Sequence, residues 1–129
     1  MDEFTIYFNK RRQWIRVSLW DVHPNTFANW KAGRWGYFLA AYENPKSGFF
    51  GDVHLVKSRV REDLVVHELE HVRVEWMWAN GETITRKNEE RLTEFLDQLV
   101  GKFYIEYRKL LKKEKQNADS STKRKGRTK

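Results

Sequence analysis

The chain of 129 residues contains no cysteine. This absence excludes disulfide bonds, thiolate zinc sites and cysteine nucleophiles together, and it leaves histidine, aspartate and glutamate as the strong metal ligands. The sequence also lacks any apolar run of the roughly 20 residues that a membrane-spanning helix needs. Residues 1–5 have neither the basic flank nor the apolar stretch of a secretory signal peptide. We therefore expect a cytoplasmic protein with no membrane partner.

Positive charge is concentrated at the C-terminal end of the chain. The formal net charge is +7, and residues 112–129 hold eight Lys or Arg against Glu114 and Asp119, which leaves about +1 for the rest. This segment has too few apolar residues to offset the entropy lost on ordering. The composition therefore predicts one globular domain over residues 1–112 and a basic, disordered tail over residues 113–129. Such a tail could contact nucleic acid non-specifically, or could only solubilise the protein.

The first half of the chain has the pattern of β-structure, with short aromatic and β-branched runs separated by turn residues. Residues 4–8 and 14–20 flank a polar connection, which predicts a hairpin. Residues 35–42 and 49–56 flank a connection that contains proline and glycine, which predicts a second hairpin. From Arg61 onward the apolar residues recur at intervals of three and four, which indicates helices.

These helices are expected over about residues 62–79 and from about residue 85 past residue 111. Asn80 and Gly81 suit the left-handed conformation that often ends a helix. The pattern as a whole predicts an α+β fold, in which a small antiparallel sheet of three or four strands precedes two helices. The sequence leaves the oligomeric state open.

The segment His67-Glu68-Leu69-Glu70-His71 lies inside the first of these predicted helices. Residues four apart are neighbours on a helix, so His67 and His71 can direct their rings at one metal ion while Glu68 stands one residue round. Imidazole nitrogens bind zinc, and the carboxylate can take a proton from water that the metal activates. The motif therefore predicts one Zn²⁺ per chain.

The alternative is that the two histidines are idle surface residues. Counted at about 100° per residue, they share their helix face with Val74 and Trp78, opposite an apolar stripe that includes Leu69. A solvated face would not ordinarily carry such apolar side chains, which weighs against the alternative.

A catalytic zinc site uses three protein ligands and water, so a third ligand is expected downstream. In the second helix, projecting the apolar stripe of Leu92 and Leu96 backward reaches Glu89, whereas Glu90 points about 100° away. A carboxylate in an apolar stripe is costly unless something compensates its charge, so we predict Glu89 as the third ligand. The alternative is that Glu89 only complements the positive end of the helix dipole.

The His-Glu-x-x-His motif followed by Asn88-Glu89 resembles the gluzincin zinc peptidases. Residues 48–100 are also similar to the small ImmA/IrrE-type, minigluzincin-like peptidases of bacteria, phages and mobile elements. The resemblance implies a minimal zincin-like domain with His67, His71 and Glu89 as zinc ligands and Glu68 as general base. It also implies a protein or peptide substrate, such as a regulator, that adds to an edge strand beside the zinc.

We expect residues 49–56 to form that edge strand, and His54 or Tyr42 to donate to the developing oxyanion. The sequence thus predicts a zinc metallopeptidase. One alternative is a zincin-like module that binds a protein without cleaving it. The other is a nucleic-acid-binding protein that uses the basic tail and exposed tryptophans, although the spacing of the six tryptophans favours the core or its rim.

Overall fold

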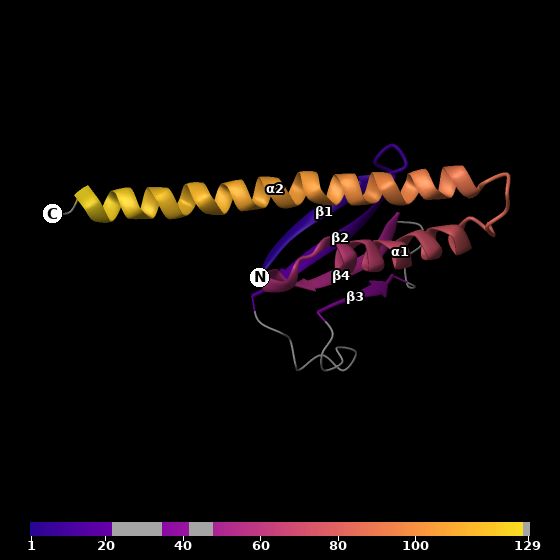
Figure 1. The fold of residues 1–129 in the computed structure, drawn as a ribbon, viewed down its shortest axis with the longest axis horizontal. Coiled ribbons are helices and arrows are strands. Elements are labelled where there is room, and N and C mark those ends of the chain that lie inside the picture. Colours follow the sequence, from indigo (N-terminus) through magenta and orange to yellow (C-terminus); the bar gives the residue numbers. More distant parts are fainter. Residues whose placement is uncertain (22–34, 42–47, 128–129) are drawn as a thin grey trace.

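The computed structural model describes residues 1–21, 35–41 and 48–127, with side chains as far as residue 119. Four strands precede two α-helices, as the α+β prediction requires (Figure 1). The elements in chain order are β1 (Asp2–Phe8), β2 (Gln13–Trp20), β3 (Gly36–Ala40), β4 (Phe49–Val56), the 3₁₀ helix η2 (Lys57–Arg59), α1 (Glu62–Ala79) and α2 (Glu89–Arg127). Neither described helix is long and apolar enough to cross a membrane.

The four strands form one sheet in the order β1-β2-β4-β3. Both predicted hairpins are confirmed, because β1 pairs antiparallel with β2 and β3 pairs antiparallel with β4. The expectation of a wholly antiparallel sheet was wrong, because β2 and β4 are parallel neighbours. Each is the returning strand of its own hairpin, so joining the hairpins through these strands makes the sheet mixed. Among the described strands, β4 is therefore internal and β3 lies at an edge.

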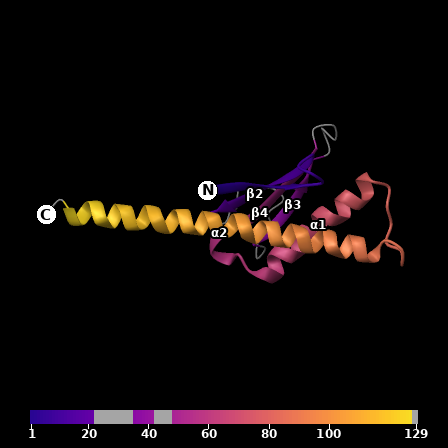
Figure 2. The ribbon, with the colours of Figure 1, turned by 90° about the horizontal axis from the view of Figure 1, so that it is seen from above.

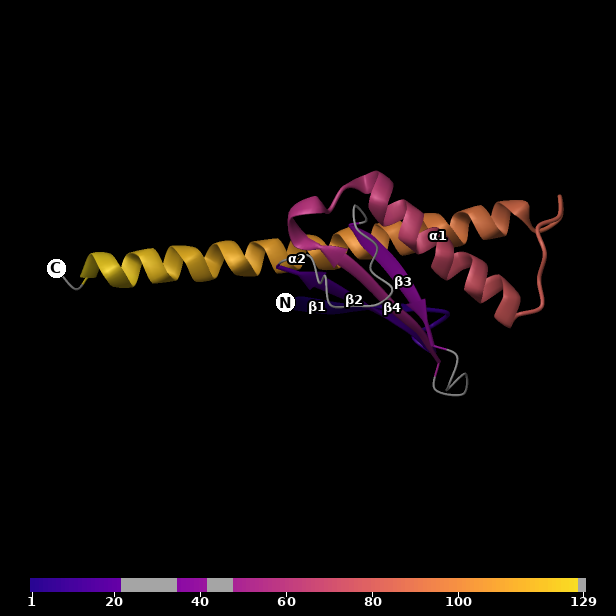
Figure 3. The same cartoon turned by 90° about the horizontal axis from the view of Figure 1, so that it is seen from below.

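One face of the sheet carries the core. Alternate residues of the two central strands, including Val17 and Leu19 of β2 and Val53 and Leu55 of β4, are buried on this face. Both helices pack on the same side of the sheet (Figure 2), because Leu69 of α1 and other helix residues belong to the same buried cluster. The chain turns beyond the C-terminal end of α1, and α2 then returns across the sheet (Figure 3).

The aromatic residues of α2 anchor this helix to the sheet. Phe103 is only 1% exposed, and its ring packs edge-on against Phe4 of β1 at 5.3 Å between centroids. Phe95 stacks on Trp76 of α1 at 4.3 Å. These contacts hold α1 and α2 in a fixed relation to each other and to the sheet.

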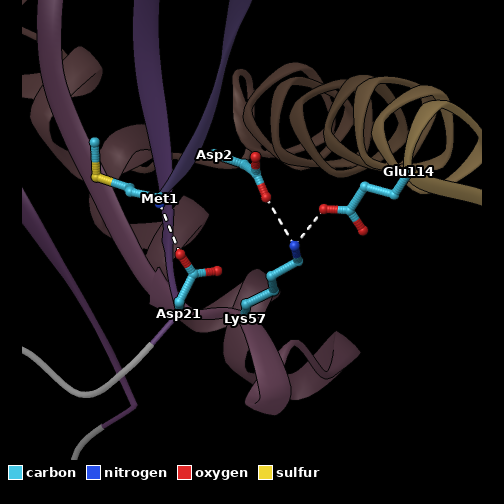
Figure 4. A network of polar contacts seen from close by, with 5 residues as sticks. All are labelled: Met1, Asp2, Asp21, Lys57 and Glu114. Atoms are coloured by element: carbon cyan, nitrogen blue, oxygen red, sulfur yellow. Dashed lines mark hydrogen bonds and ion pairs between the residues drawn. The ribbon is translucent and has the colours of Figure 1, made fainter. Parts of the chain in front are cut away.

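The second helix continues well past the predicted end of the domain. The expectation of a disordered tail from residue 113 differs from the structure, in which α2 remains helical to Arg127 (Figure 1). Lys57 forms ion pairs with both Asp2 of β1 and Glu114 of α2 (Figure 4). The ammonium group of Lys57 therefore links α2 to the sheet at Glu114, one turn beyond Leu110, which still packs against the core. Lys115, Gln116 and Ala118 in the next turn are good helix formers.

Candidate metal centre

Helix α1 brings together the three residues of the predicted motif. His67, Glu68 and His71 each offer a nitrogen or carboxylate oxygen, and these ligand atoms all lie within 4.8 Å of one another. The two imidazole rings are 5.0 Å apart and nearly perpendicular at 84°. The Nε2 atom of His67 lies 3.8 Å from the Oε1 atom of Glu68. Within the described residues, this is the group of histidine and acidic side chains with the geometry to hold a metal ion.

The three side chains differ in burial. Glu68 is 3% exposed, whereas His67 and His71 are exposed. The buried residues of α1 include Val65 and Leu69, and Glu68 is buried beside them. The histidines lie on the outer side. The helix therefore presents two solvent-accessible nitrogen donors next to a shielded carboxylate.

The expected burial of the histidine face was wrong. Trp78, which shares that face, is 68% exposed and does not cover the rings. Burial therefore gives no argument against idle surface histidines. The argument that remains is the grouping of both rings with a carboxylate that the fold keeps out of solvent.

Two cavities meet at Glu68. The first has a volume of 520 Å³ and is lined by His67 and Glu68 together with Trp35, Arg59 and other residues at the start of α1. The second, of 370 Å³, is lined by Glu68, His71 and other residues of α1 on one side and by residues of β3 on the other. The carboxylate and both histidines therefore border a hollow between α1 and β3, which is the edge strand among the described strands.

This arrangement corrects the predicted edge strand. Residues 49–56 form β4, which pairs with β2 on one side and β3 on the other, so its backbone groups are already used. Strand β3 (Gly36–Ala40) is the described strand that lies both at the sheet edge and beside the histidines. The sequence could not identify it, because strand order depends on how the two hairpins associate.

The donor set fits zinc in chemistry and in approximate spacing. Two nitrogens bound to one zinc at about 2.0–2.1 Å lie no more than about 4.2 Å apart. The donors here lie within 4.8 Å of one another, so small rotations of the exposed rings of His67 and His71 would close the difference. Nitrogen and carboxylate donors are also ordinary zinc ligands. The site therefore fits a zinc ion held by both histidines.

Glu89 is not brought into this group. It is the first residue of α2 and is exposed, so the predicted cost of burying its carboxylate does not arise. It lies in the first turn with Glu90, where an acid complements the helix dipole. Nothing in the grouping of donor atoms supports Glu89 as a ligand, and its role stays a prediction.

The two predicted oxyanion donors have different outcomes. Tyr42 lies outside the described residues. His54 of β4 projects from the sheet face opposite the helices, where its Nδ1 atom accepts a hydrogen bond from Trp20 Nε1 at 3.0 Å and its ring stacks on Tyr37 at 4.7 Å. Burial lowers the pKa of His54. Since the sheet separates this imidazole from α1, the structure does not bring it to the candidate centre.

Two cationic residues near the histidines were not predicted from the sequence. Arg59 and Arg61 border the 520 Å³ cavity together with His67 and Glu68. The signal available in the sequence was the Arg59-Val60-Arg61 pattern just before the first helix. In an extended segment, two arginines separated by one residue point to the same side.

No known protein-family model matches the chain. The curated proteins and the solved structures contain no significant match either.

Proposed function

We propose that this protein is a zinc-dependent hydrolase of peptide bonds, with His67 and His71 as metal ligands and Glu68 as general base. The observation that carries the proposal is the grouping of two exposed imidazoles with a 3%-exposed carboxylate, within 4.8 Å, at a cavity beside an edge strand. An isolated pair of surface histidines would not require a shielded acid. The resemblance of the motif to gluzincin peptidases supports the same reaction class.

In the proposed reaction the histidines hold the metal ion and Glu68 transfers the proton. A bound zinc ion would polarise the scissile carbonyl and lower the pKa of water. Glu68 Oε1, 3.8 Å from His67 Nε2, is within reach of a water molecule beside the histidines. Its carboxylate accepts a proton from that water as the water attacks, and returns the proton to the leaving amine. The low exposure of Glu68, 3%, limits the exchange of this proton with bulk solvent.

The outer edge of β3, which pairs with no other described strand, provides a means to hold an extended substrate. A peptide that adds to this edge gains main-chain hydrogen bonds without requiring a particular sequence. Because the 370 Å³ cavity is lined by both β3 and His71, a peptide on this edge would pass in front of the histidines. The scissile carbonyl can thus be positioned by the backbone while Glu68 faces the attacking water.

The test uses a mixture of peptides made by digesting a whole proteome, because the natural substrate is not needed to detect hydrolysis. Purified full-length protein, reconstituted with zinc, is incubated with the mixture, and new peptide termini are identified by mass spectrometry. We expect cleavage by the parent that a chelator abolishes, and none by Glu68→Gln although that variant keeps its zinc. Cleavage by Glu68→Gln at the parent rate would contradict the proposal. Zinc binding without any cleavage would instead favour a non-catalytic binding module.

A further inference from the structure

We propose that the groove along β3 selects peptides with an acidic side chain at one end and a bulky apolar side chain about four residues away, on either side of the cleaved bond. This inference rests on the proposed hydrolase function and names the substrate class of that site. It is carried by the different chemistry of the two cavities that meet at Glu68.

The cationic end is the 520 Å³ cavity at the start of α1. The guanidinium of Arg59 lies over the ring of Trp35 at 4.6 Å from the centroid. Within the described part of the chain, no carboxylate pairs with Arg59. Arg61 is different, because it pairs with Asp63. Arg59 therefore brings an uncompensated charge to the cavity, with the aromatic ring fixing its position.

A carboxylate is the ligand that this end fits. A guanidinium presents several donors in a planar fork that matches a carboxylate geometrically. The charge of Arg61 at the same rim is compensated by Asp63, which lines the cavity as well, so Arg59 is the cation left to bind a ligand. A metal ion at the neighbouring histidines would raise the positive potential further. A peptide carboxyl group, from an acidic side chain or the C-terminus, is the ordinary source of such a ligand in a peptide substrate.

The opposite end of the groove favours apolar groups and disfavours acids. It is lined by Val74 and Trp78 of α1 and by Leu39 of β3. Trp78 and Leu39 are 68% and 45% exposed and line the same cavity, so together they present apolar surface that a ligand can cover. Glu75 also lines this end and would repel a second carboxylate. The two ends therefore have opposite preferences.

The strand fixes the spacing between the two ends. The cationic cavity reaches β3 at Trp35 and Gly36, and the apolar end reaches it at Leu39. Four residues of extended chain span about 13 Å. Glu68 lines both cavities and so lies between the ends. An extended peptide paired with β3 would thus present its acidic and apolar side chains on the two sides of the general base.

The test measures binding separately from cleavage. Zinc-loaded full-length protein with Glu68→Gln is titrated against fluorescein-labelled ten-residue peptides, and fluorescence anisotropy reports binding. One peptide carries two adjacent glutamates with a phenylalanine four residues later; in the others, the glutamates are replaced by glutamine or by lysine. A fourth peptide keeps the glutamates and replaces phenylalanine by alanine. Each is also measured against Arg59→Glu, Arg59→Gln and the matched control Arg12→Glu, an exposed turn residue that lines neither cavity.

We expect the glutamate peptide to bind about tenfold more tightly than the glutamine peptide, as one charge-assisted contact provides. Loss of the phenylalanine should weaken binding similarly. Arg59→Gln should remove the preference for glutamate, and Arg59→Glu should reverse it in favour of lysine, whereas Arg12→Glu should leave it unchanged. Equal binding of the first three peptides, or an equal effect of Arg12→Glu, would overturn the inference.

The two proposals can fail separately. Cleavage of the peptide mixture with no preference for acidic residues would overturn the groove specificity and leave the hydrolase intact. Charge-reversed binding by Arg59→Glu without cleavage by the parent would support the groove and count against the hydrolase.

Discussion

The side-chain oxygen of Asn88 accepts a hydrogen bond from the backbone N–H of Thr85 at 2.7 Å, while the backbone N–H of Asn88 faces the Thr85 hydroxyl at 3.4 Å. This reciprocal pair is a capping box at the start of α2. Asn88 also donates to the backbone oxygen of Thr83 at 2.7 Å. The Asn88-Glu89 pair that resembles a metal-ligand signature therefore has a local structural role, which is to begin the helix.

Substitution of Glu89 tests whether this residue binds zinc or only belongs to the first turn of α2. Because Glu89 is exposed and lies outside the group of donor atoms, Glu89→Gln should leave zinc affinity unchanged. A competition titration with a chromogenic zinc chelator measures this affinity. Weakening of about tenfold or more would reinstate Glu89 as the third ligand. Glu90→Gln, which neighbours it in the same helical turn, is the matched control.

The docking of α2 on the sheet depends on Phe103. This side chain is 1% exposed, so Phe103→Ala should lower the free energy of unfolding by about 3–5 kcal/mol. Ile105 on the same helix is 53% exposed, and Ile105→Ala should change it by no more than about 0.5 kcal/mol. Urea unfolding followed by circular dichroism measures both. Equal effects would mean that the helix does not pack on this face.

Alanine substitutions at Gly51 and Gly101 should change the stability of the protein in opposite directions. Gly51 of β4 has φ +142°, and a Cβ atom there would lie 2.3 Å from the backbone oxygen of Leu39. Gly51→Ala should therefore destabilise the protein by about 2–3 kcal/mol, as strain and a backbone clash combine. Gly101 of α2 has open space around it, so Gly101→Ala should stabilise the helix by about 0.5–1 kcal/mol. Thermal unfolding compares the two variants with the parent, and a stable Gly51→Ala protein would refute the strained geometry.

The ion pairs of Lys57 predict a dependence of stability on pH. The hydrogen bond from Lys57 holds the pKa of Asp2 below its ordinary value. A lowered pKa means that this contribution is fully present above about pH 4, the ordinary value, and is lost as the pH falls through the folded-state pKa. Asp2→Asn should therefore cost about 0.5–1 kcal/mol at pH 7 and almost nothing near pH 2. Urea unfolding at both pH values tests this, and a cost that does not change with pH would contradict it.

Local features of the fold could be predicted from the sequence. The bounds of α1, residues 62–79, follow from apolar periodicity and from the turn at Asn80-Gly81, where Gly81 has φ +65°. Both hairpins follow from alternation and turn residues. Each of these signals lies within about 20 residues of chain, so no knowledge of the tertiary arrangement was needed.

Features that depend on association between distant segments could not be predicted. The parallel pairing of β2 with β4 joins two hairpins, and the pattern of neither hairpin indicates which strand the other will pair with. The exposure of Trp78 depends on where the sheet ends. The contact of α2 with Lys57 at Glu114 joins residues that are 57 positions apart in the chain. Composition alone could not include that contact, and so it favoured disorder.

The sequence predicted the three residues that the structure groups, His67, Glu68 and His71. It also predicted Glu89 and His54, which lie outside this group, and Tyr42, which lies outside the described residues. The spacing of His67 and His71 was enough to place both rings side by side. That Glu68 is buried while both histidines are exposed depends on tertiary packing, which no local pattern records. For the same reason, the cationic cavity around Arg59 emerged only from the structure.

The central claim is that His67 and His71 hold a zinc ion, and zinc content measures it most directly. Full-length parent protein, His67→Ala, His71→Ala and the control His54→Gln are loaded with zinc, dialysed and analysed by inductively coupled plasma mass spectrometry, with circular dichroism to verify folding. The glutamine in the control can still accept the hydrogen bond from Trp20. We predict about one zinc per chain for the parent and the control, and a loss of at least about tenfold in affinity for either alanine variant. A folded parent without zinc, or an alanine variant that binds zinc as the parent does, would contradict the account.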